Sequence, residues 1–494
     1  MRRDYAQLGF GGLASKILGG VREILLARYF GTGHVADAYR ASLSLTLSPA
    51  HLVTTRIIQT CFIPLYARYS ADEREKGRAL FQSLLLVFLV LGVLLGALLL
   101  FFADPIVATV LRGFDADRSA LAVRMLRIMA IGVPFYIYSS VLGALGSAER
   151  DFTIPALRPG LQNLGMLVMI VAAASAGKPA LAAFGFSGAY ALLSIYATAH
   201  LLRRRLLPIR LSLERELVRE VWAKLWALLR PLVLLSFLFE ASVLVERAVA
   251  SLLGPGRVAA VDYARYVTET LHFLLAVPIG IIGLSLFANL SEEEIRPKID
   301  RILSLLAISL LPLSAFLIVN GRDVLAVLYM RGRFDETSLH VTERALWGFS
   351  LGLFAFSASY TLQRILNARM RNTVVLLAET LGIAANIAFL LLFYQRLGVL
   401  VIGLGVTIGS LVSLLAYLLA LRLSLPLTKK GLAVGLSAAP VYLLASWTGL
   451  GWLGRGIGPL GLQSVFFLVY WMIVIMIFKD LRRLVRDQIG GRKR

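Results

Sequence analysis

Cysteine, histidine and charged residues are all scarce in this sequence, and each scarcity excludes a class of protein. The one cysteine is Cys61, so no disulfide can form within the chain. Five histidines and one cysteine make no cluster with metal-ligand spacing, and no P-loop or Ser–His–Asp order is present. Charged residues make up 16% of the chain, against about 25% in soluble proteins, and no polar stretch is long enough for a soluble domain. We therefore expect neither a disulfide-bonded module, nor a zinc protein, nor a soluble enzyme.

Long apolar runs, by contrast, recur from end to end. The chain is 58% hydrophobic and has a mean hydropathy of +0.77. A segment of about 20 apolar residues can cross the hydrocarbon core of a bilayer, and about fourteen such segments are present, the last two near 431–448 and 460–478. We predict an all-α polytopic membrane protein with about fourteen transmembrane helices. The first segment lacks a short apolar core with a cleavage site, so we expect it to be retained.

The distribution of positive charge predicts the orientation of these helices. The net charge is +22, and most of the Lys and Arg outside the apolar segments lies in alternate loops and in the tail. Such loops are normally cytoplasmic. An even number of spans then places both termini in the cytoplasm. Because the positive excess has this explanation and aromatic residues do not interleave with basic stripes, nucleic acid is not an expected partner.

A weak internal repeat predicts two lobes. Residues 112–115 (RGFD) and 331–335 (RGRFD) each precede a helix start and a long apolar span. Six spans followed by six with the same orientation imply two lobes related by a pseudo-two-fold axis along the membrane normal. The predicted parts are an N-terminal lobe at 1–202, a basic cytoplasmic linker at 203–217, a C-terminal lobe at 218–422, two additional helices within 423–478 and a basic cytoplasmic tail at 479–494.

Charges inside the first apolar segment, residues 9–30, are the strongest functional signal. The segment contains Lys16, Arg22, Glu23 and Arg28. A charge at mid-membrane costs about 2.5–3.5 kcal/mol on insertion scales, so it normally faces a wet cavity or a partner. Lys16 and Glu23 are seven residues apart and share a helix face, which Arg22 does not. A cavity that receives an anion is one interpretation, and pairing of Arg22 and Glu23 with other helices for packing alone is the alternative.

The second span carries further charges. It begins with Asp37 and Arg40 and later contains His51 and Arg56. Arg56 lies deep enough in the span to face a cavity, whereas a lone histidine is more often a satisfied polar contact. Asp37 lies near a helix start, where a carboxylate also stabilises the helix dipole without any ligand. Both interpretations of Asp37 stay open at this point.

The eighth span holds a second charged stripe. Arg265, Glu269 and His272 follow one another at helical spacing and lie on one face. This spacing predicts either an anion site or a charge-coupled latch at a cavity. A self-neutralising Arg–Glu pair is the alternative.

Carboxylates in later spans suggest a coupling site. Glu240 lies in the seventh span and Glu379 in the eleventh, and Thr407 follows in the twelfth. Carboxylate and hydroxyl oxygens suit a hard cation such as Na⁺, and a carboxylate with a raised pKa can carry H⁺. Neutralisation of each carboxylate by a neighbouring helix explains the same residues equally well.

These patches resemble the MurJ/MviN family of the MOP flippase superfamily. The resemblance rests on residues 15–23 (SKILGGVRE), 27–33 (ARYFGTG), 36–39 (ADAY), 62–64 (FIP), 263–265 (YAR) and 331–335 (RGRFD). It implies fourteen helices in two six-helix lobes, with the last two helices forming a groove for a lipid tail. It further implies a transporter, not an enzyme, that moves lipid II, an undecaprenyl-pyrophosphate-linked peptidoglycan precursor, across the bacterial inner membrane by alternating access.

The resemblance also implies roles for individual residues. The cation-coupling positions of the family match Glu240, Glu379 and Thr407, although this matching is loose. The expected substrate-binding residues combine the family's cavity positions with the other charges in these spans: Lys16, Arg22, Glu23, Arg28, Asp37, Arg56, Arg265 and Glu269. The chain departs from the family after the start of the second span, where a family arginine falls at Ala50 or His51. Arg56 or His51 would have to replace that arginine.

This departure leaves the substrate open. Another polyprenyl-linked glycan, such as an O-antigen, capsule or exopolysaccharide repeat unit, is the alternative to lipid II. A cation-coupled multidrug antiporter fits less well, because its cavity would be acidic. We expect no cofactor, with Na⁺, H⁺ or the membrane potential driving transport. The expected partners are the lipid-linked saccharide and membrane lipids, and we expect a monomer.

Overall fold

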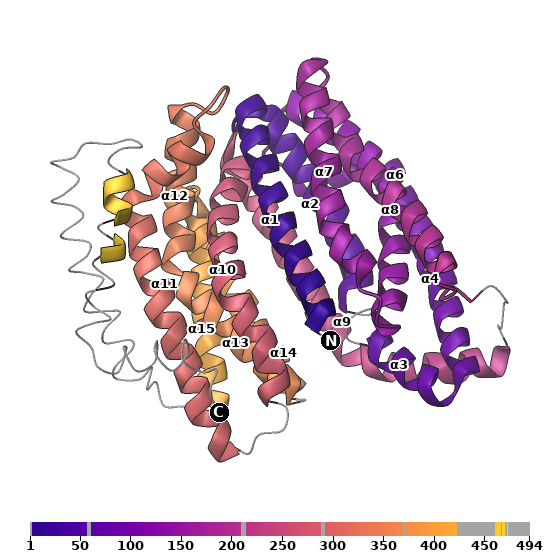
Figure 1. Cartoon of the computed structure of the whole chain (residues 1–494). Coiled ribbons are helices and arrows are strands. Elements are labelled where there is room, and N and C mark those ends of the chain that lie inside the picture. Colours follow the sequence, from indigo (N-terminus) through magenta and orange to yellow (C-terminus); the bar gives the residue numbers. More distant parts are fainter. Residues whose placement is uncertain are drawn as a thin grey trace. The chain divides into compact units, whose positions relative to one another are not determined.

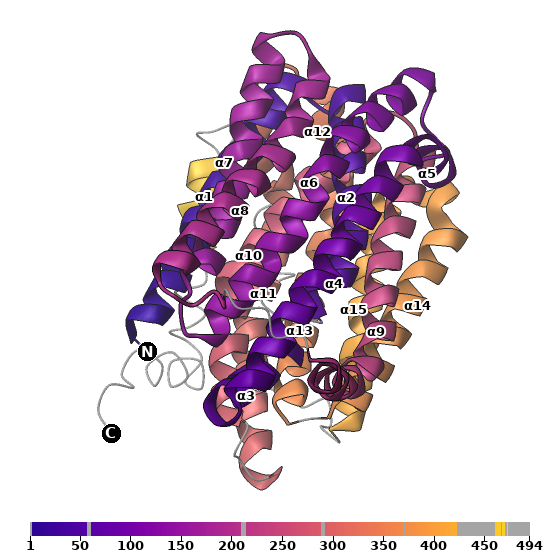
Figure 2. The ribbon, with the colours of Figure 1, turned by 90° about the vertical axis from the view of Figure 1, so that its right-hand side faces the viewer.

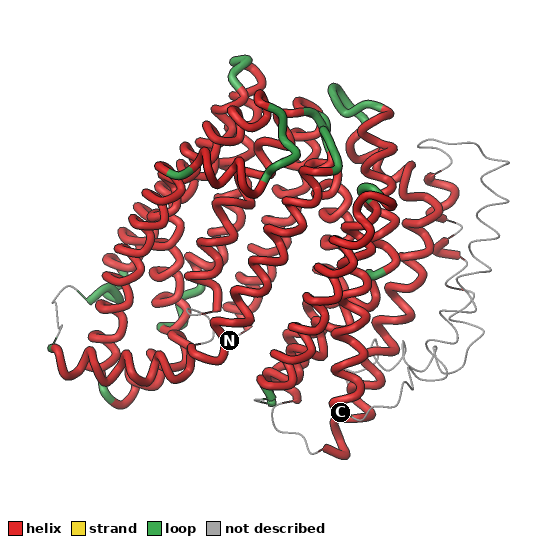
Figure 3. The backbone as a smooth tube through the Cα atoms, turned by 180° about the vertical axis from the view of Figure 1, so that it is seen from behind, coloured by secondary structure: helices red, strands yellow, loops and turns green. Residues whose placement is uncertain are grey.

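The computed structural model describes residues 2–56, 61–208, 214–287, 292–369, 371–421, 460–465, 467–469 and 472. These residues are helical or lie in connecting turns, and strand is absent from them (Figure 3). The chain forms two compact units, which are described separately below. Unit 1 comprises Met1–Ala259 and Arg331–Phe334, and unit 2 comprises Ala260–Met330 and Asp335–Arg494. The all-helical prediction is confirmed.

Unit 1 contains nine α-helices and a short 3-10 helix among its described residues (Figure 1). In chain order they are α1 (Arg2–Phe30), α2 (His34–Arg56), α3 (Ile63–Asp72), α4 (Arg74–Phe101), α5 (Ala103–Val110), α6 (Ala116–Ala148), α7 (Thr153–Ser175), η2 (Pro179–Ala183), α8 (Phe184–Arg203) and α9 (Arg215–Leu252). The contacts that define the units place α9 with α2 in unit 1. The predicted lobes follow the sequence repeat instead of these contacts, so their boundaries stay a prediction.

Helix α6 lies at the centre of unit 1. It packs against α2, α4 and α8, and Figure 2 shows it between α4 and α8. In its apolar window 72% of residues are buried, against 28% in α4, which is therefore suited to face lipid. Small residues let the helices approach closely: a Cβ added to Gly132 of α6 would lie 2.7 Å from the Cα of Ser187 in α8. Helix α1 packs on α7.

Unit 2 is arranged around its last described long helix. Its helices are α10 (Arg257–Phe287), whose first turn belongs to unit 1, α11 (Glu292–Tyr329), α12 (Glu336–Leu351), α13 (Leu353–Ala368), α14 (Asn372–Leu397) and α15 (Leu400–Ala420). Helix α15 packs against α12, α13 and α14. Helices α12 and α13 form a pair bent by 48° at Gly352. A Cβ on Gly352 would meet the Thr407 hydroxyl at 2.2 Å, so glycine permits α15 to lie in this bend.

Seven of the described helices are long and apolar enough to cross a membrane, or up to nine spans if each bent pair counts as one. Helices α1, α2 and α10, which carry the charges noted in the sequence, lie outside this set. The predicted span at 431–448, and most of the one at 460–478, lie outside the described residues. The polytopic class is confirmed, and the number fourteen stays a prediction.

The two repeat motifs cap helices in the same way. Asp115 accepts a hydrogen bond from the Arg118 backbone N–H at 2.9 Å and begins α6, and Asp335 accepts from the Ser338 N–H at 2.8 Å and begins α12. These bonds to backbone N–H groups hold the pKa of both carboxyls below their ordinary range. The structure thus gives the repeat, which is weak in sequence, a shared local function.

The structure reveals a second pair of repeated motifs, which the sequence analysis did not identify. Residues 31–36 (GTGHVA) precede and open α2, and residues 254–259 (GPGRVA) precede and open α10. Gly31 and Gly254 both have positive φ, at 56° and 107°. The two turns touch within unit 1, because a Cβ on Gly256 would lie 2.5 Å from the Thr32 carbonyl oxygen. The shared G-x-G spacing was a signal that an internal alignment would have found.

Replacing Asp115 by alanine should lower stability by about 1 kcal/mol, because the first turn of α6 loses an acceptor for its N–H groups. Asparagine at this position should retain most of the stability, because its side-chain oxygen also accepts. Thermal unfolding of the purified protein in detergent measures the difference. Equal midpoints for the alanine and asparagine variants would contradict the capping role.

Candidate functional site

The charged residues of α1 and α2 meet in one buried group, which we call the Glu23 cluster: Arg22, Glu23, Arg40 and Asn163. Glu23 is 1% exposed and forms ion pairs with both Arg22 and Arg40. Arg22 also donates to the Asn163 side-chain oxygen at 2.9 Å. The Asn163 amide in turn donates to the Ser15 carbonyl at 3.0 Å, which ties α7 to α1.

This arrangement corrects one prediction and extends another. Helical spacing placed Arg22 on a different face from Glu23, yet the long guanidinium side chain reaches back to pair with it. The cluster brings two arginines to one carboxylate. Sequence reasoning noted Arg40 without assigning it to the site, and it missed Asn163, whose role depends on the packing of α7 against α1.

Asp37 has a structural position. It is fully buried and accepts hydrogen bonds from the Gly256 and Ala259 N–H groups at 2.6 and 2.9 Å. These N–H groups flank the start of α10, where helical donors otherwise lack partners. An Arg118 nitrogen lies 3.5 Å from the same carboxylate. Asp37 therefore caps a helix that starts 220 residues later in the chain; its predicted part in substrate binding stays a prediction.

The other predicted residues of unit 1 lie apart from the Glu23 cluster or beyond the described side chains. Lys16 is half-buried on α1. Arg28 is exposed near the end of α1, where its guanidinium lies 5.8 Å from the centre of the Tyr29 ring. Arg56 is the last residue of α2, and its side chain lies outside the described residues.

In unit 2, the predicted stripe of α10 has different environments along its length. Arg265 is half-buried with its guanidinium 5.2 Å from the centre of the Phe349 ring, and Glu269 is exposed. His272 is buried, shares a 2.9 Å hydrogen bond with the Ser357 hydroxyl and packs against the Phe356 ring at 4.6 Å. The histidine is thus a satisfied packing residue within unit 2.

The structure does not bring the predicted cation-coupling residues of unit 2 together. Glu379 accepts from the Tyr417 hydroxyl at 2.5 Å, while the Thr407 hydroxyl donates to the Gly348 carbonyl at 2.7 Å. Thr407 and Tyr417, the partner of Glu379, are ten residues apart on α15, which is about 15 Å along the helix. Glu240 lies in unit 1, 3.7 Å from the His51 ring. Among the described residues no group of His, Cys, Asp and Glu could hold a metal ion.

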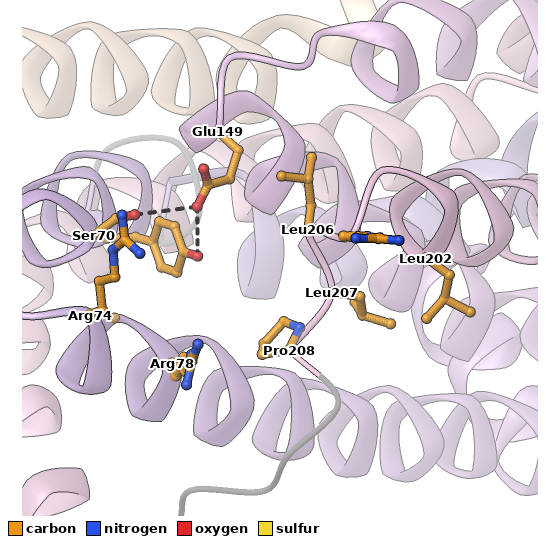
Figure 4. Close-up of a pocket in the computed structure, with 11 residues that line it drawn as sticks. Ser70, Arg74, Arg78, Glu149, Leu202, Leu206, Leu207 and Pro208 are labelled. Atoms are coloured by element: carbon orange, nitrogen blue, oxygen red, sulfur yellow. Dashed lines mark hydrogen bonds between the residues drawn. The ribbon is translucent and has the colours of Figure 1, made fainter.

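A basic pocket of about 600 Å³ opens within unit 1 between three turns that are predicted to be cytoplasmic (Figure 4). Its lining includes Arg74 and Arg78 of α4, Arg205 after α8, and the apolar residues Leu202, Leu206, Leu207 and Pro208. Glu149 accepts hydrogen bonds from Tyr66 at 2.9 Å and from Ser70 at 3.3 Å, as Figure 4 shows. The turn that carries Glu149 is therefore fixed to α3.

The next residues of that turn are fixed as well. Asp151 accepts from the Thr153 N–H at 3.0 Å and lies 2.8 Å from a ring nitrogen of His200 in α8. Burial raises the pKa of Asp151, but the hydrogen bonds from Thr153 and His200 outweigh it, so the pKa lies below its ordinary value. These bonds join the ends of α6, α7 and α8 at the side of the pocket.

A known protein family matches most of this chain. The family model described as lipid II flippase MurJ matches residues 26–471. A probable lipid II flippase MurJ of Aquifex aeolicus is 28% identical over 513 aligned positions, covering 96% of this chain and 94% of that protein. One of Buchnera aphidicola from Acyrthosiphon pisum is 27% identical, covering 82% and 80%.

Solved structures show the same fold. A lipid II flippase MurJ in an inward closed conformation superimposes with a TM-score of 0.81 at 18% identity, covering 96% of this chain and 99% of that one. An inward-facing MATE family transporter of the MOP superfamily gives a TM-score of 0.68 at 15% identity, covering 82% and 94%. The family model covers most of the chain. This chain belongs to the lipid II flippase MurJ family.

Proposed function

We propose that this chain carries lipid II across the bacterial inner membrane and that the Glu23 cluster is part of its anion-binding surface. The observation that carries the proposal is a pair of arginines, Arg22 and Arg40, gathered on one buried carboxylate inside a membrane helix bundle. Charges inside a bundle normally mark a wet cavity or a binding site. A lipid-linked diphosphate is a partner of matching charge.

The chemistry of the cluster suits a substrate that must bind and leave. A guanidinium presents a planar fork of donors that fits phosphate oxygens. Glu23 neutralises part of the charge when the substrate is absent, which keeps an anion from binding too tightly. The Tyr39 hydroxyl lies buried next to the cluster with no hydrogen-bond partner among the described residues, so it is a further donor for an entering oxygen.

The remaining features of the proposal follow the sequence. The positive-inside distribution supports cytoplasmic termini. Na⁺, H⁺ or the membrane potential drives the cycle, with Glu240, Glu379 and Thr407 as the residues to test, and the transporter acts as a monomer. Arg22 and Arg265 are the cations expected to bind the substrate diphosphate, and each is tested separately.

Complementation of bacteria depleted of their own lipid II flippase tests the proposal. The wild-type chain should restore growth, and Arg22→Ala and Arg265→Ala should each lose most of this ability at equal membrane levels, because each removes a charged donor to phosphate. Arg127→Ala is the control, since Arg127 is 45% exposed and pairs with Asp104 at the surface. A well-expressed wild type that fails to restore growth would contradict lipid II as the substrate.

The alternative substrates have a direct test in the same cells. Relatives named as lipid II flippases cover most of the chain, whereas the MATE similarity, at 15% identity, shows the fold alone. If lipid II transport fails, strains lacking an O-antigen or capsule flippase provide the next complementation host.

A further inference from the structure

Arg158, near the start of α7, is a buried cation that the sequence analysis did not single out. Its guanidinium carbon lies 4.4 Å from the centre of the Tyr136 ring and 5.4 Å from that of Tyr190. The two rings pack edge to face with their centres 4.8 Å apart. The Tyr190 hydroxyl donates to the Gln162 side chain at 2.6 Å, which fixes its ring. Residues of α6, α7 and α8 thus hold the guanidinium in one place.

The charge of Arg158 lacks a carboxylate partner in the described part of the chain. No ion pair joins Arg158 to a described Asp or Glu, although Arg22, Arg40 and Arg118 each have one. Its Nη2 atom is buried and has no hydrogen-bond acceptor among the described residues. A buried charged donor without an acceptor carries a large desolvation penalty. Stacking on tyrosine rings returns about 0.5–2 kcal/mol, which is too little to compensate it.

The residues opposite Arg158 add no negative charge next to it. His51 of α2 packs against the Tyr136 ring with 5.9 Å between ring centres, and the Arg158 charge acts on its imidazole. The described carboxylate of Glu240 lies 3.7 Å from this histidine ring and forms no ion pair with Arg158. The guanidinium therefore faces an imidazole and two phenol groups.

We propose that Arg158 is an anion-binding residue that takes a phosphate oxygen of the lipid-linked diphosphate, with Tyr136, Tyr190 and His51 forming the walls of its site. This inference rests on the proposed function and adds a second cationic site to the Glu23 cluster. Bound phosphate supplies the acceptor that Nη2 lacks. The tyrosine rings hold the guanidinium plane so that its edge is presented to the ligand.

The position of the site explains the departure in α2. At Ala50 or His51 this chain lacks the arginine that the family resemblance led us to expect, and Arg56 or His51 was the expected replacement. Arg158 reaches the same region from α7, beside the His51 ring. Arg158 would thus supply from α7 the positive charge that the resemblance led us to expect on α2.

A relocation experiment tests this inference. We compare the full-length wild type with Arg158→Ala, His51→Arg and the double variant Arg158→Ala/His51→Arg. Affinity for undecaprenyl pyrophosphate in detergent should fall roughly tenfold or more in Arg158→Ala, as expected for loss of a charged hydrogen bond. The double variant should recover most of that affinity and of the complementing activity, because it returns the charge to the same place from α2. Arg158→Lys should bind undecaprenyl pyrophosphate more weakly than the double variant, since an ammonium lacks the planar fork.

Thermal unfolding separates binding from packing. A purely structural Arg158 would lower the unfolding temperature in the alanine variant while leaving the affinity of the folded fraction unchanged, and that result would overturn the inference. So would a double variant that folds and binds no better than Arg158→Ala. The binding measurement does not depend on the growth assay. If the wild type binds undecaprenyl pyrophosphate through Arg158 but does not restore growth, the result contradicts lipid II as the substrate and still supports the anion site.

Discussion

Replacing Glu23 by alanine should destabilise unit 1 more than removal of any surface charge, by about 3–5 kcal/mol. Glu23 is 1% exposed and pairs with two arginines, of which Arg40 is itself buried. Without the carboxylate both guanidinium groups lose a buried counter-charge. We expect little folded protein to reach the membrane, and we expect the fraction that does to unfold at a markedly lower temperature.

A double variant distinguishes charge compensation from loss of a specific side chain. Glu23→Gln/Arg40→Leu removes one charge of each sign, and replacing a buried pair by neutral groups is often close to neutral in stability. We therefore expect the double variant to be more stable than Glu23→Ala alone. Size-exclusion profiles and thermal unfolding in detergent provide the measurement. A Glu23→Ala protein as stable as the wild type would contradict this role of the carboxylate.

The Glu23 cluster also shows which parts of the site could be predicted from the sequence. Charged residues in an apolar segment are visible without a structure, and the structure brings those of α1 and α2 together. The partners were not visible, because they depend on which helices pack together. Asn163 is an ordinary polar residue in sequence and becomes a site residue because α7 lies on α1.

Asp37 and Arg158 show why contacts between distant helices could not be predicted from the sequence. Asp37 gave a correct signal of a helix start, but its partners are N–H groups more than 200 residues away, which no local pattern reveals. Arg158 was overlooked because an arginine near the end of an apolar segment normally extends to the membrane surface. Its burial between Tyr136 and Tyr190 results from the packing of three helices. Glu379 and Thr407 have separate hydrogen-bond partners in unit 2, so their shared role in cation coupling stays a prediction.

Among glycine-to-alanine replacements, we expect those in the repeat motifs to lower stability the most. Gly113 contacts the end of α9, where an added Cβ would lie 2.0 Å from the Ser251 carbonyl oxygen. Gly332 contacts the end of α1, where an added Cβ would lie 2.2 Å from the Arg28 carbonyl oxygen. The contacts are reciprocal, because the motif of each repeat packs on the first helix of the other. The Arg333 N–H donates to the Arg28 carbonyl at 2.9 Å, which satisfies an acceptor left over at the helix end.

Gly332→Ala should therefore abolish complementation and lower stability by about 1–3 kcal/mol beyond backbone strain, because the backbone of α1 must move to admit the methyl group. Gly177→Ala is the matched control: Gly177 has the same φ of 63°, lies in the same unit and has open space around it. The control should lose only about 1 kcal/mol, the cost of a left-handed conformation for an L-residue. Equal losses in the two variants would show that strain alone explains the glycine. A larger loss in Gly332→Ala would show that the reciprocal contact of the two repeats is needed for the folded transporter.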